Sequence, residues 1–244
     1  MVAEAKEPPP VSIIAEDETS TEEGFSAKEH YGLKTLNTKL VDNNGQGFEN
    51  LYGTRNFRTV IANVMYRGGG NNTKNRDGTR PNQNPLPANG LKSLCEEGFD
   101  TAIYMYSAGY ESAPPKVSCI SRKTGKQNTL DYLQMSPYQE PKVREMLEMV
   151  SKKIKAARSK APFTPAYIHC WNGWHASGLI SAYMLRQFCN YSGSQAVKYW
   201  DLNTDGNDRE PAFEKLRKQI RDFKPYEDLK LTSKERSAFC LPSK

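Results

Sequence analysis

The segment Ala166–Gly178, AYIHCWNGWHASG, decides how the rest of the chain is interpreted. Its first residues are apolar and predict the end of a buried strand. The apolar residues that follow Gly178, from Leu179 to Phe188, predict a buried helix. Between them lie a cysteine, two glycines and a serine, so the segment predicts a strand, a tight loop and a helix N-terminus.

This predicted loop has the properties of an anion-binding site. The first turn of a helix carries unpaired N–H groups and the positive end of the helix dipole, and both attract anions. Cys170 is the first residue of the loop, where the same field favours the thiolate form. A thiolate beside an anion site suits covalent transfer of a phosphate group.

The spacing His169-Cys170-x-x-Gly173-x-x-Ala176-Ser177-Gly178 resembles the signature of the cysteine-dependent protein tyrosine phosphatases, especially their dual-specificity branch. The resemblance implies an α/β fold in which a central, mostly parallel sheet is flanked by helices and carries the signature loop, or P-loop. It implies that His169 orients the loop, Cys170 is the nucleophile that forms a phosphocysteine, and Ser177 eases thiolate departure. The implied ligand-binding residues are Trp171, Asn172, Gly173, Trp174, His175 and Ala176.

The resemblance extends over about residues 55–200. Phe57–Gly68 predicts a strand, which ends in Gly68-Gly69-Gly70. A polar stretch at 71–87 predicts a long loop, Pro87–Gly98 a short helix that Gly98 ends, and Phe99–Tyr106 a strand. This order is similar to the opening of dual-specificity phosphatase domains.

The sequence departs from the family at Ala176, where the signature has an invariant arginine. A guanidinium grips two oxygens of the transferring phosphate, and removing such an arginine costs on the order of 10³–10⁵ in rate. His175 is adjacent, but neighbouring residues entering a helix point about 100° apart, so it is not expected to fill the same volume. Cations that another segment would have to supply are Arg67, Arg76, Arg122 and Lys123.

Two further features concern the pocket wall and the general acid. Trp171 and Trp174 either wall the pocket and stack on a flat ligand or pack under a neighbouring loop. The family places an acid in a loop upstream of the cysteine, and the matching loop here offers Glu140. The alternative role for Glu140 is to stabilise the N-terminus of the helix that begins there.

Three functions remain open on the sequence. The first is a phosphatase-like domain, or pseudophosphatase, that binds a phosphate-bearing or other anionic ligand and is impaired in hydrolysis of phosphate monoesters. The second is an active cysteine-dependent phosphatase whose arginine comes from another segment. The third is a different thiol-dependent enzyme on the same fold. Whether the chain is an enzyme stays undecided, and a protein partner is compatible with the first function.

No cofactor or metal is expected. Asp201-x-Asn203-x-Asp205-Gly206 fits the first half of a calcium loop, but the position of the bidentate acid is Ala212, so an Asx turn is favoured. The net charge of +6 is spread among acids along the chain, so nucleic-acid binding is not expected.

Composition leaves the compartment open. The mean hydropathy of −0.75 indicates a soluble protein, and no stretch approaches the roughly 20 apolar residues of a membrane span. The chain is cytoplasmic, or it is the mature form of an exported protein whose signal was removed. Five cysteines leave at least one free thiol, for which Cys170 is the candidate, while Cys189 is expected to be plain core packing.

The remaining segments complete an α/β domain. Residues 1–35 predict an acidic, proline-rich tail that is disordered or loosely docked, and 36–244 the phosphatase-like domain. Two strands are expected within Cys119–Gln134, and an amphipathic helix is expected to start at Pro141. Further helices are expected at 194–200 and 211–223, and the last twenty residues are only weakly periodic.

Overall fold

A computed structural model describes residues 26–48, 51, 53–70, 83–159 and 164–242. These residues form a mixed α/β domain around a six-stranded sheet with the order β1-β2-β6-β3-β5-β4. The strands are β1 (Arg58–Ile61), β2 (Met65–Gly68), β3 (Thr101–Tyr104), β4 (Lys116–Ile120), β5 (Gln127–Gln134) and β6 (Ala166–His169). The four central strands are parallel and the two edge strands are antiparallel to their neighbours, which confirms the predicted fold class.

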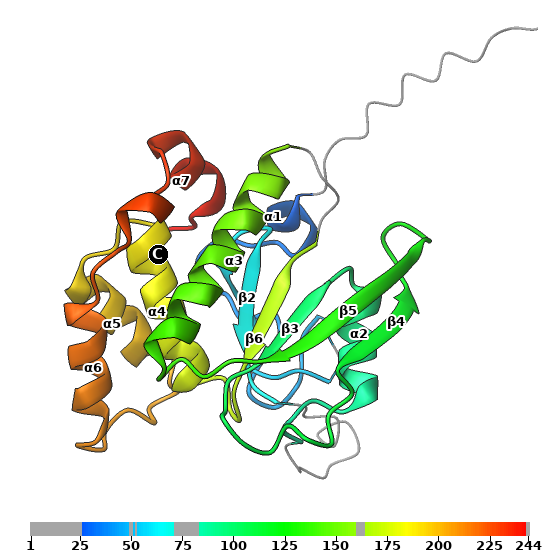
Figure 1. Ribbon diagram of the computed structural model, residues 1–244, viewed down its shortest axis with the longest axis horizontal. Coiled ribbons are helices and arrows are strands. Elements are labelled where there is room, and N and C mark those ends of the chain that lie inside the picture. The colour runs from blue at the N-terminus through cyan, green and yellow to red at the C-terminus, as the bar shows by residue number, and fades with distance from the viewer. Residues whose placement is uncertain (1–25, 49–50, 52, 71–82, 160–163, 243–244) are drawn as a thin grey trace, which may run out of the picture.

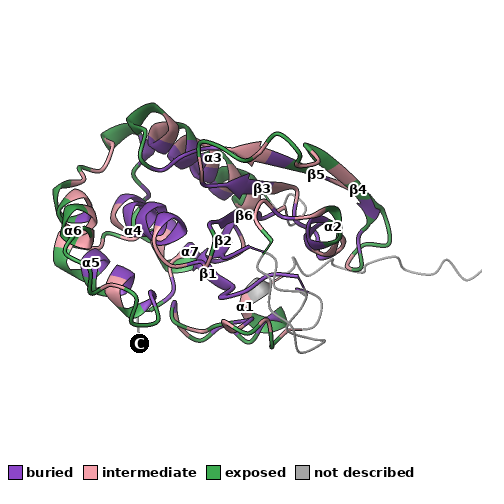
Figure 2. Ribbon diagram, turned by 90° about the horizontal axis from the view of Figure 1, so that it is seen from below, coloured by how far each residue is buried: buried purple, intermediate pink, exposed green. Residues whose placement is uncertain are grey.

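Helices cover both faces of this sheet. Helices α3 and α4 lie on one face, and α2 lies on the other, with α5 and α6 outside α4 (Figure 1). Figure 2 shows that α4 and the sheet strands beneath it are the most deeply buried elements. The helices are α1 (Ala27–His30), α2 (Ala88–Glu96), α3 (Glu140–Arg158), α4 (Ala176–Phe188), α5 (Gly193–Leu202), α6 (Phe213–Asp222), the 3₁₀ helix η3 (Glu227–Leu229) and α7 (Ser233–Phe239). No helix in the described part of the chain is both long and apolar enough to cross a membrane.

The sheet topology brings three chain segments together at one edge. Strand β6 pairs in parallel with both β2 and β3, and His169 is in register with Gly68 and Tyr104. Parallel strands end on the same side, so the segments that follow β2, β3 and β6 meet there. Cys170 directly follows β6 and therefore lies at this edge.

The prediction of one continuous strand over Phe57–Gly68 is wrong, because the structure has two strands there, β1 and β2. The two halves pair antiparallel, with Arg58 opposite Arg67. Asn63 takes a positive φ of 64° between them, a conformation that asparagine tolerates and that reverses the chain. The alternation in sequence continues across this turn, which conceals it.

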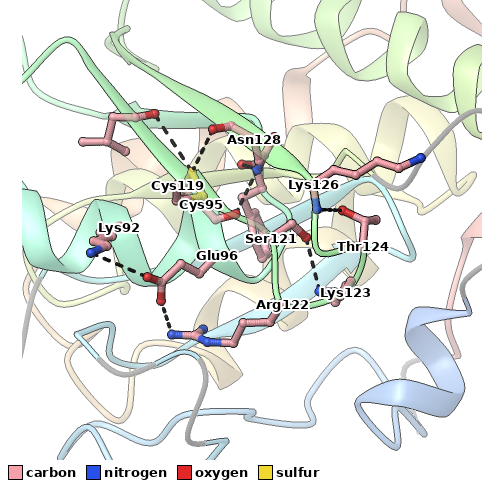
Figure 3. The surroundings of a disulfide bond; sticks show 12 residues. Lys92, Cys95, Glu96, Cys119, Ser121, Arg122, Lys123, Thr124, Lys126 and Asn128 are labelled. Carbon is pink, nitrogen blue, oxygen red and sulfur yellow. Dashed lines mark hydrogen bonds and ion pairs between the residues drawn. A yellow bond between two sulfur atoms is a disulfide. The ribbon is translucent and has the colours of Figure 1, made fainter.

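Two disulfides correct the expectation for Cys189. Cys189, at the end of α4, is bonded to Cys240, and Cys95 of α2 is bonded to Cys119 of β4 (Figure 3). The first bond ties the C-terminal segment to the core, where Phe239 and Leu241 are buried in spite of the weak periodicity there. Cys170 is the free cysteine, as expected.

The N-terminal boundary at residue 35 stays a prediction, because residues 1–25 are outside the described part. Within the segment assigned to the tail, Tyr31 and Leu33 are buried, and the Tyr31 hydroxyl donates to Glu97 at 2.9 Å. Packing in the structure therefore extends further towards the N-terminus than that boundary. Most of the predicted long loop, 71–82, also lies outside the description.

Candidate functional site

The Cys170 loop packs tightly on the backbone that follows β2. Gly173 has a φ of +77°, and a Cβ atom there would lie 2.6 Å from the Gly68 carbonyl carbon and 2.7 Å from the Gly69 nitrogen. Real Cβ atoms do not approach backbone so closely, so only glycine fits both the conformation and the contact. The backbone at Gly173 is therefore in direct contact with the backbone at Gly68 and Gly69.

The carbonyl groups of the loop are held by donors from surrounding elements. Trp171 O accepts from the Gly70 amide at 2.9 Å, and Asn172 O accepts from Asn56 Nδ2 at 2.8 Å. Further along, Gly173 O and Trp174 O both accept from one nitrogen of Arg67, and His175 O accepts from Trp200 Nε1 at 3.3 Å. Each carbonyl from 171 to 175 therefore has a fixed direction.

The direction of the amides follows from the direction of the carbonyls. In a trans peptide unit the N–H points opposite to the C=O of the same unit, and the loop contains no cis bond. The N–H groups of Gly173, Trp174 and His175 therefore point away from Asn56 and Arg67. No described residue accepts a hydrogen bond from them, nor from the three amides at 176–178 that begin α4. The loop and the start of α4 thus carry six consecutive N–H groups for which the described residues supply no acceptor.

Cys170 lies at the start of this loop with only 3% of its surface exposed. Its sulfur is 3.4 Å from the Ser177 hydroxyl, which also donates to Gly68 O at 3.2 Å. Ser177 is the second residue of α4, so it connects Cys170, the helix start and the end of β2. The structure places these two predicted residues in contact.

His169 is buried and hydrogen-bonded on both ring nitrogens. Its Nδ1 donates to Cys170 O at 3.4 Å, which leaves Nε2 as the acceptor for the Tyr132 hydroxyl at 2.7 Å. Tyr132 in turn accepts from the Leu86 amide at 2.9 Å. Burial lowers the pKa of His169 to about 3, so the ring is neutral near pH 7. It orients the loop through a hydrogen bond and supplies no positive charge to the thiol.

The neutral, buried state of His169 predicts an acid-sensitive fold. In the unfolded chain the ring takes up a proton below its ordinary pKa of 6.5, whereas the folded ring resists until about pH 3. The contribution of this group to the free energy of unfolding is therefore fully present above pH 6.5. It falls by about 1.4 kcal/mol per pH unit below that pH. Urea unfolding at a series of pH values should give this slope between pH 6 and 4. The variant His169→Asn, which can still donate and accept, should lose this part of the slope; an unchanged slope would contradict the assignment.

Aromatic side chains form the surroundings of the sulfur. Burial, and then the nearby Cys170, raise the pKa of Tyr106, Tyr138 and Tyr167, so all three stay protonated. Tyr106 accepts the Trp171 amide at 3.0 Å. Trp171 is 48% exposed and lines a cavity of about 760 Å³, whose other walls are residues 83–88 and 111–114. This placement puts Trp171 at the rim of the site.

Trp174, His175 and Ala176 lie differently. Trp174 donates through Nε1 to Asp205 at 3.0 Å and so packs against the segment that follows α5. The His175 ring stacks on Phe213 at 4.2 Å, and its Nε2 donates to Asn207 O at 2.6 Å. That ring is engaged outside the loop and does not replace the missing guanidinium. Ala176 is the first residue of α4 and is 2% exposed.

Glu140, the candidate general acid, is exposed at the first position of α3. Among the described residues its carboxylate has no hydrogen bond or ion pair, so nothing ties it to Cys170. Its position also fits the alternative role at the helix N-terminus. The acid of the hydrolytic mechanism therefore stays a prediction.

Three of the four cations considered as replacements for the signature arginine are engaged elsewhere. Arg67 holds loop carbonyls from the side opposite the amides. Arg122 pairs with Glu96, and Lys123 pairs with Glu97 at 3.3 Å. Arg76 lies outside the described residues.

The acids of the calcium-like segment are likewise paired with basic side chains. Asp201 accepts from Arg217 at 2.8 Å, and Asp205 pairs with Lys39 at 2.7 Å. Among the described residues, no group of three or more histidine, cysteine or acidic side chains is arranged to hold a metal ion.

Sequence analysis did not identify the residues that hold the loop through hydrogen bonds from neighbouring elements. Asn56 and Tyr132 carried no signal, because each is hydrogen-bonded to the signature segment across more than 30 positions of sequence. Arg67 had a signal, since an arginine inside an otherwise apolar strand is unusual and must find partners when buried. It was considered as a cation for the ligand, and its observed partners are backbone carbonyls.

Comparison with known proteins gives similarity at the level of structure. No protein-family profile matches the chain, and no curated protein sequence is significantly similar. Among solved structures, the core catalytic domain of the PP-IP phosphatase SIW14 from S. cerevisiae, in complex with citrate, is similar with a TM-score of 0.44 and 16% identity. That match covers 72% of this chain and 90% of the SIW14 domain.

The second similar protein is TpbA from P. aeruginosa. It matches with a TM-score of 0.39 and 14% identity, over 73% of this chain and 89% of TpbA. Its cysteine-to-serine variant in complex with phosphotyrosine matches with a TM-score of 0.35 and 13% identity, over 73% and 96% of the two chains. Of these neighbours, SIW14 is named a phosphatase, and the TpbA variant is bound to phosphotyrosine. Because the scores and identities are low, the function proposed below depends on the geometry of the Cys170 loop.

Proposed function

We propose that this protein is a phosphatase-like domain that binds a phosphate-bearing or other anionic ligand on the Cys170 loop and is impaired in hydrolysing phosphate monoesters. The observation that carries the proposal is the loop itself: its carbonyls are held outward, and six amides beside a free cysteine have no acceptor among the described residues. Ala176 offers no charge to the transition state. The ligand is therefore bound by backbone N–H groups and the α4 dipole.

An active phosphatase with a borrowed arginine is supported less well. Of the described cations considered for that role, Arg67 is committed to the opposite side of the loop, and Arg122 and Lys123 are paired with glutamates. A different thiol-dependent enzyme remains the other alternative, because the aromatic surroundings of Cys170 suit a less anionic substrate.

The disulfides bear on the compartment. Such bonds persist in oxidising compartments and are rare in the cytosol. The pairs Cys95–Cys119 and Cys189–Cys240 therefore favour the exported form over the cytoplasmic one. Cys170 stays a free thiol, buried beside Ser177, while the other four cysteines are paired. This is consistent with a chemical role for its thiol.

The test combines thiol labelling with turnover. Iodoacetamide at neutral pH, without reductant, should alkylate Cys170, and inorganic phosphate should protect it because both compete for the same loop. Aryl phosphate turnover should be about 10³-fold or more below that of a loop with its arginine. The variant Cys170→Ser should lose the label. Substantial hydrolysis that Cys170→Ser abolishes would favour the active phosphatase, and a Cys170 that does not react would contradict the proposal.

A further inference from the structure

Two buried arginines lie side by side beneath the Cys170 loop. Arg58 of β1 and Arg67 of β2 are directly opposite in the antiparallel register, so their side chains share one face of the sheet. That face carries α4, since Gly178 of α4 lies against Arg67 Nη2. The two residues are 1% and 0% exposed. Arginine is almost never buried so completely without a paired acid.

Neither guanidinium has such an acid. Within the described chain, neither forms an ion pair, and Arg67 instead donates to Gly173 O, Trp174 O and, at 3.4 Å, the Tyr199 hydroxyl. Arg67 Nε has no acceptor among the described residues. Arg58 lacks more of its hydrogen bonds, because its Nε and Nη2 are both buried without an acceptor among the described residues. Three buried nitrogen atoms on adjacent cations are thus without an acceptor, which costs far more than a single neutral polar atom left unpaired.

The carboxylate of Asp205 does not neutralise these two arginines. Asp205 interacts with Arg58 at long range, but one of its oxygens binds Lys39 at 2.7 Å and the other binds Trp174 Nε1 at 3.0 Å. Asp205 is therefore shared between Lys39 and Arg58, and it does not balance the charges of both Arg58 and Arg67. Burial, and then the charge of Arg67, lower the pKa of Arg58 to about 10, which still leaves it protonated near neutral pH.

We propose that Arg58 and Arg67 together bind a small monovalent anion of chloride size, in a second anion site on the carbonyl side of the Cys170 loop. The site offers only donors, which suits an anion that carries no proton. The unpaired atoms have almost no exposed surface, which favours a small anion over a phosphate ester. Water would satisfy the N–H groups but would leave both charges unbalanced.

This site is separate from the one in the proposed function. The loop peptides lie between the two, with carbonyls facing Arg67 and amides facing away. An anion beside Arg67 holds in place the side chain that fixes Gly173 and Trp174. It therefore stabilises the fold without competing for the Cys170 ligand.

Thermal unfolding of the full chain tests the proposal. Sodium chloride replaces sodium gluconate at constant ionic strength, with saturating inorganic phosphate present to occupy the Cys170 loop. The midpoint should rise by about 4 °C as chloride saturates the site, and bromide should act in the same direction. Equal midpoints in chloride and gluconate would overturn the proposal. So would a chloride effect that phosphate abolishes, because the anion would then be at the Cys170 loop.

A matched pair of variants locates the effect. Arg58→Met removes the guanidinium and keeps most of its volume, and it should remove the chloride dependence. Arg122→Met removes a surface arginine paired with Glu96 and should retain it. If Arg58→Met does not fold, bromide-soaked crystals of the unmodified protein decide the matter. Anomalous density within hydrogen-bond distance of Arg58 supports the site, and its absence there overturns it.

Discussion

Replacing Ala176 with arginine is expected to raise the rate of aryl phosphate hydrolysis by about 10³-fold, the lower end of what such an arginine contributes to phosphoryl transfer. The rest of the loop is in place: Cys170 and Ser177 are in contact at 3.4 Å, and the amides of residues 173–178 have no acceptor among the described residues. Position 176 is the first residue of α4, beside the predicted ligand. The guanidinium therefore restores the charge that the loop lacks. Initial rates with para-nitrophenyl phosphate measure the gain.

Two controls make the Ala176→Arg result specific. Ala176→Met adds a side chain of similar length without charge and should produce no gain. Ala176→Arg combined with Cys170→Ser should lose the gain, since the reaction needs the nucleophile. If Ala176→Arg binds phosphate normally and still shows no turnover, the defect is not the missing guanidinium and the proposed function is incorrect on that point.

Adding a single methyl group at Gly173 is expected to disrupt the site. Gly173→Ala places its Cβ 2.6 Å from the Gly68 carbonyl carbon, and backbone on both sides prevents an easy shift. The left-handed conformation itself costs an alanine about 1 kcal/mol, and the clash brings the expected loss of unfolding free energy to roughly 3 kcal/mol or more. Urea unfolding gives the free energy, and phosphate protection of Cys170 against alkylation gives the loss of binding.

Gly125→Ala is the matched control for Gly173→Ala. Gly125 has a similar φ of +65°, and a Cβ there would meet nothing within 4 Å. It should cost only the conformational penalty of about 1 kcal/mol and should leave phosphate protection unchanged. Equal losses in the two variants would show that the approach of the loop to Gly68 and Gly69 does not matter.

Much of the fold could be predicted from local pattern. The helix before Gly98 and the long amphipathic helix beginning near Pro141 are found as α2 and α3, because caps and 3.6-residue periodicity are local properties. The turn at Asn63 was missed, since its two strands continue one alternating pattern. The Cys189–Cys240 bond was missed as well, because sequence spacing does not say which cysteines meet.

The sequence by itself determined the strand, loop and helix around Cys170, the contact partners His169 and Ser177, and the absence of an arginine at 176. These follow from residue type and spacing along one short segment. Tertiary structure decided what lies behind the loop: Arg67 on its carbonyls, Asn56 on Asn172, and Arg58 beside Arg67 without an acid. The contacts of Arg67 and Asn56 with the loop join residues more than 100 positions apart, which the pairing of β2 with β6 brings together. Arg58 lies beside Arg67 because β1 and β2 pair in antiparallel register.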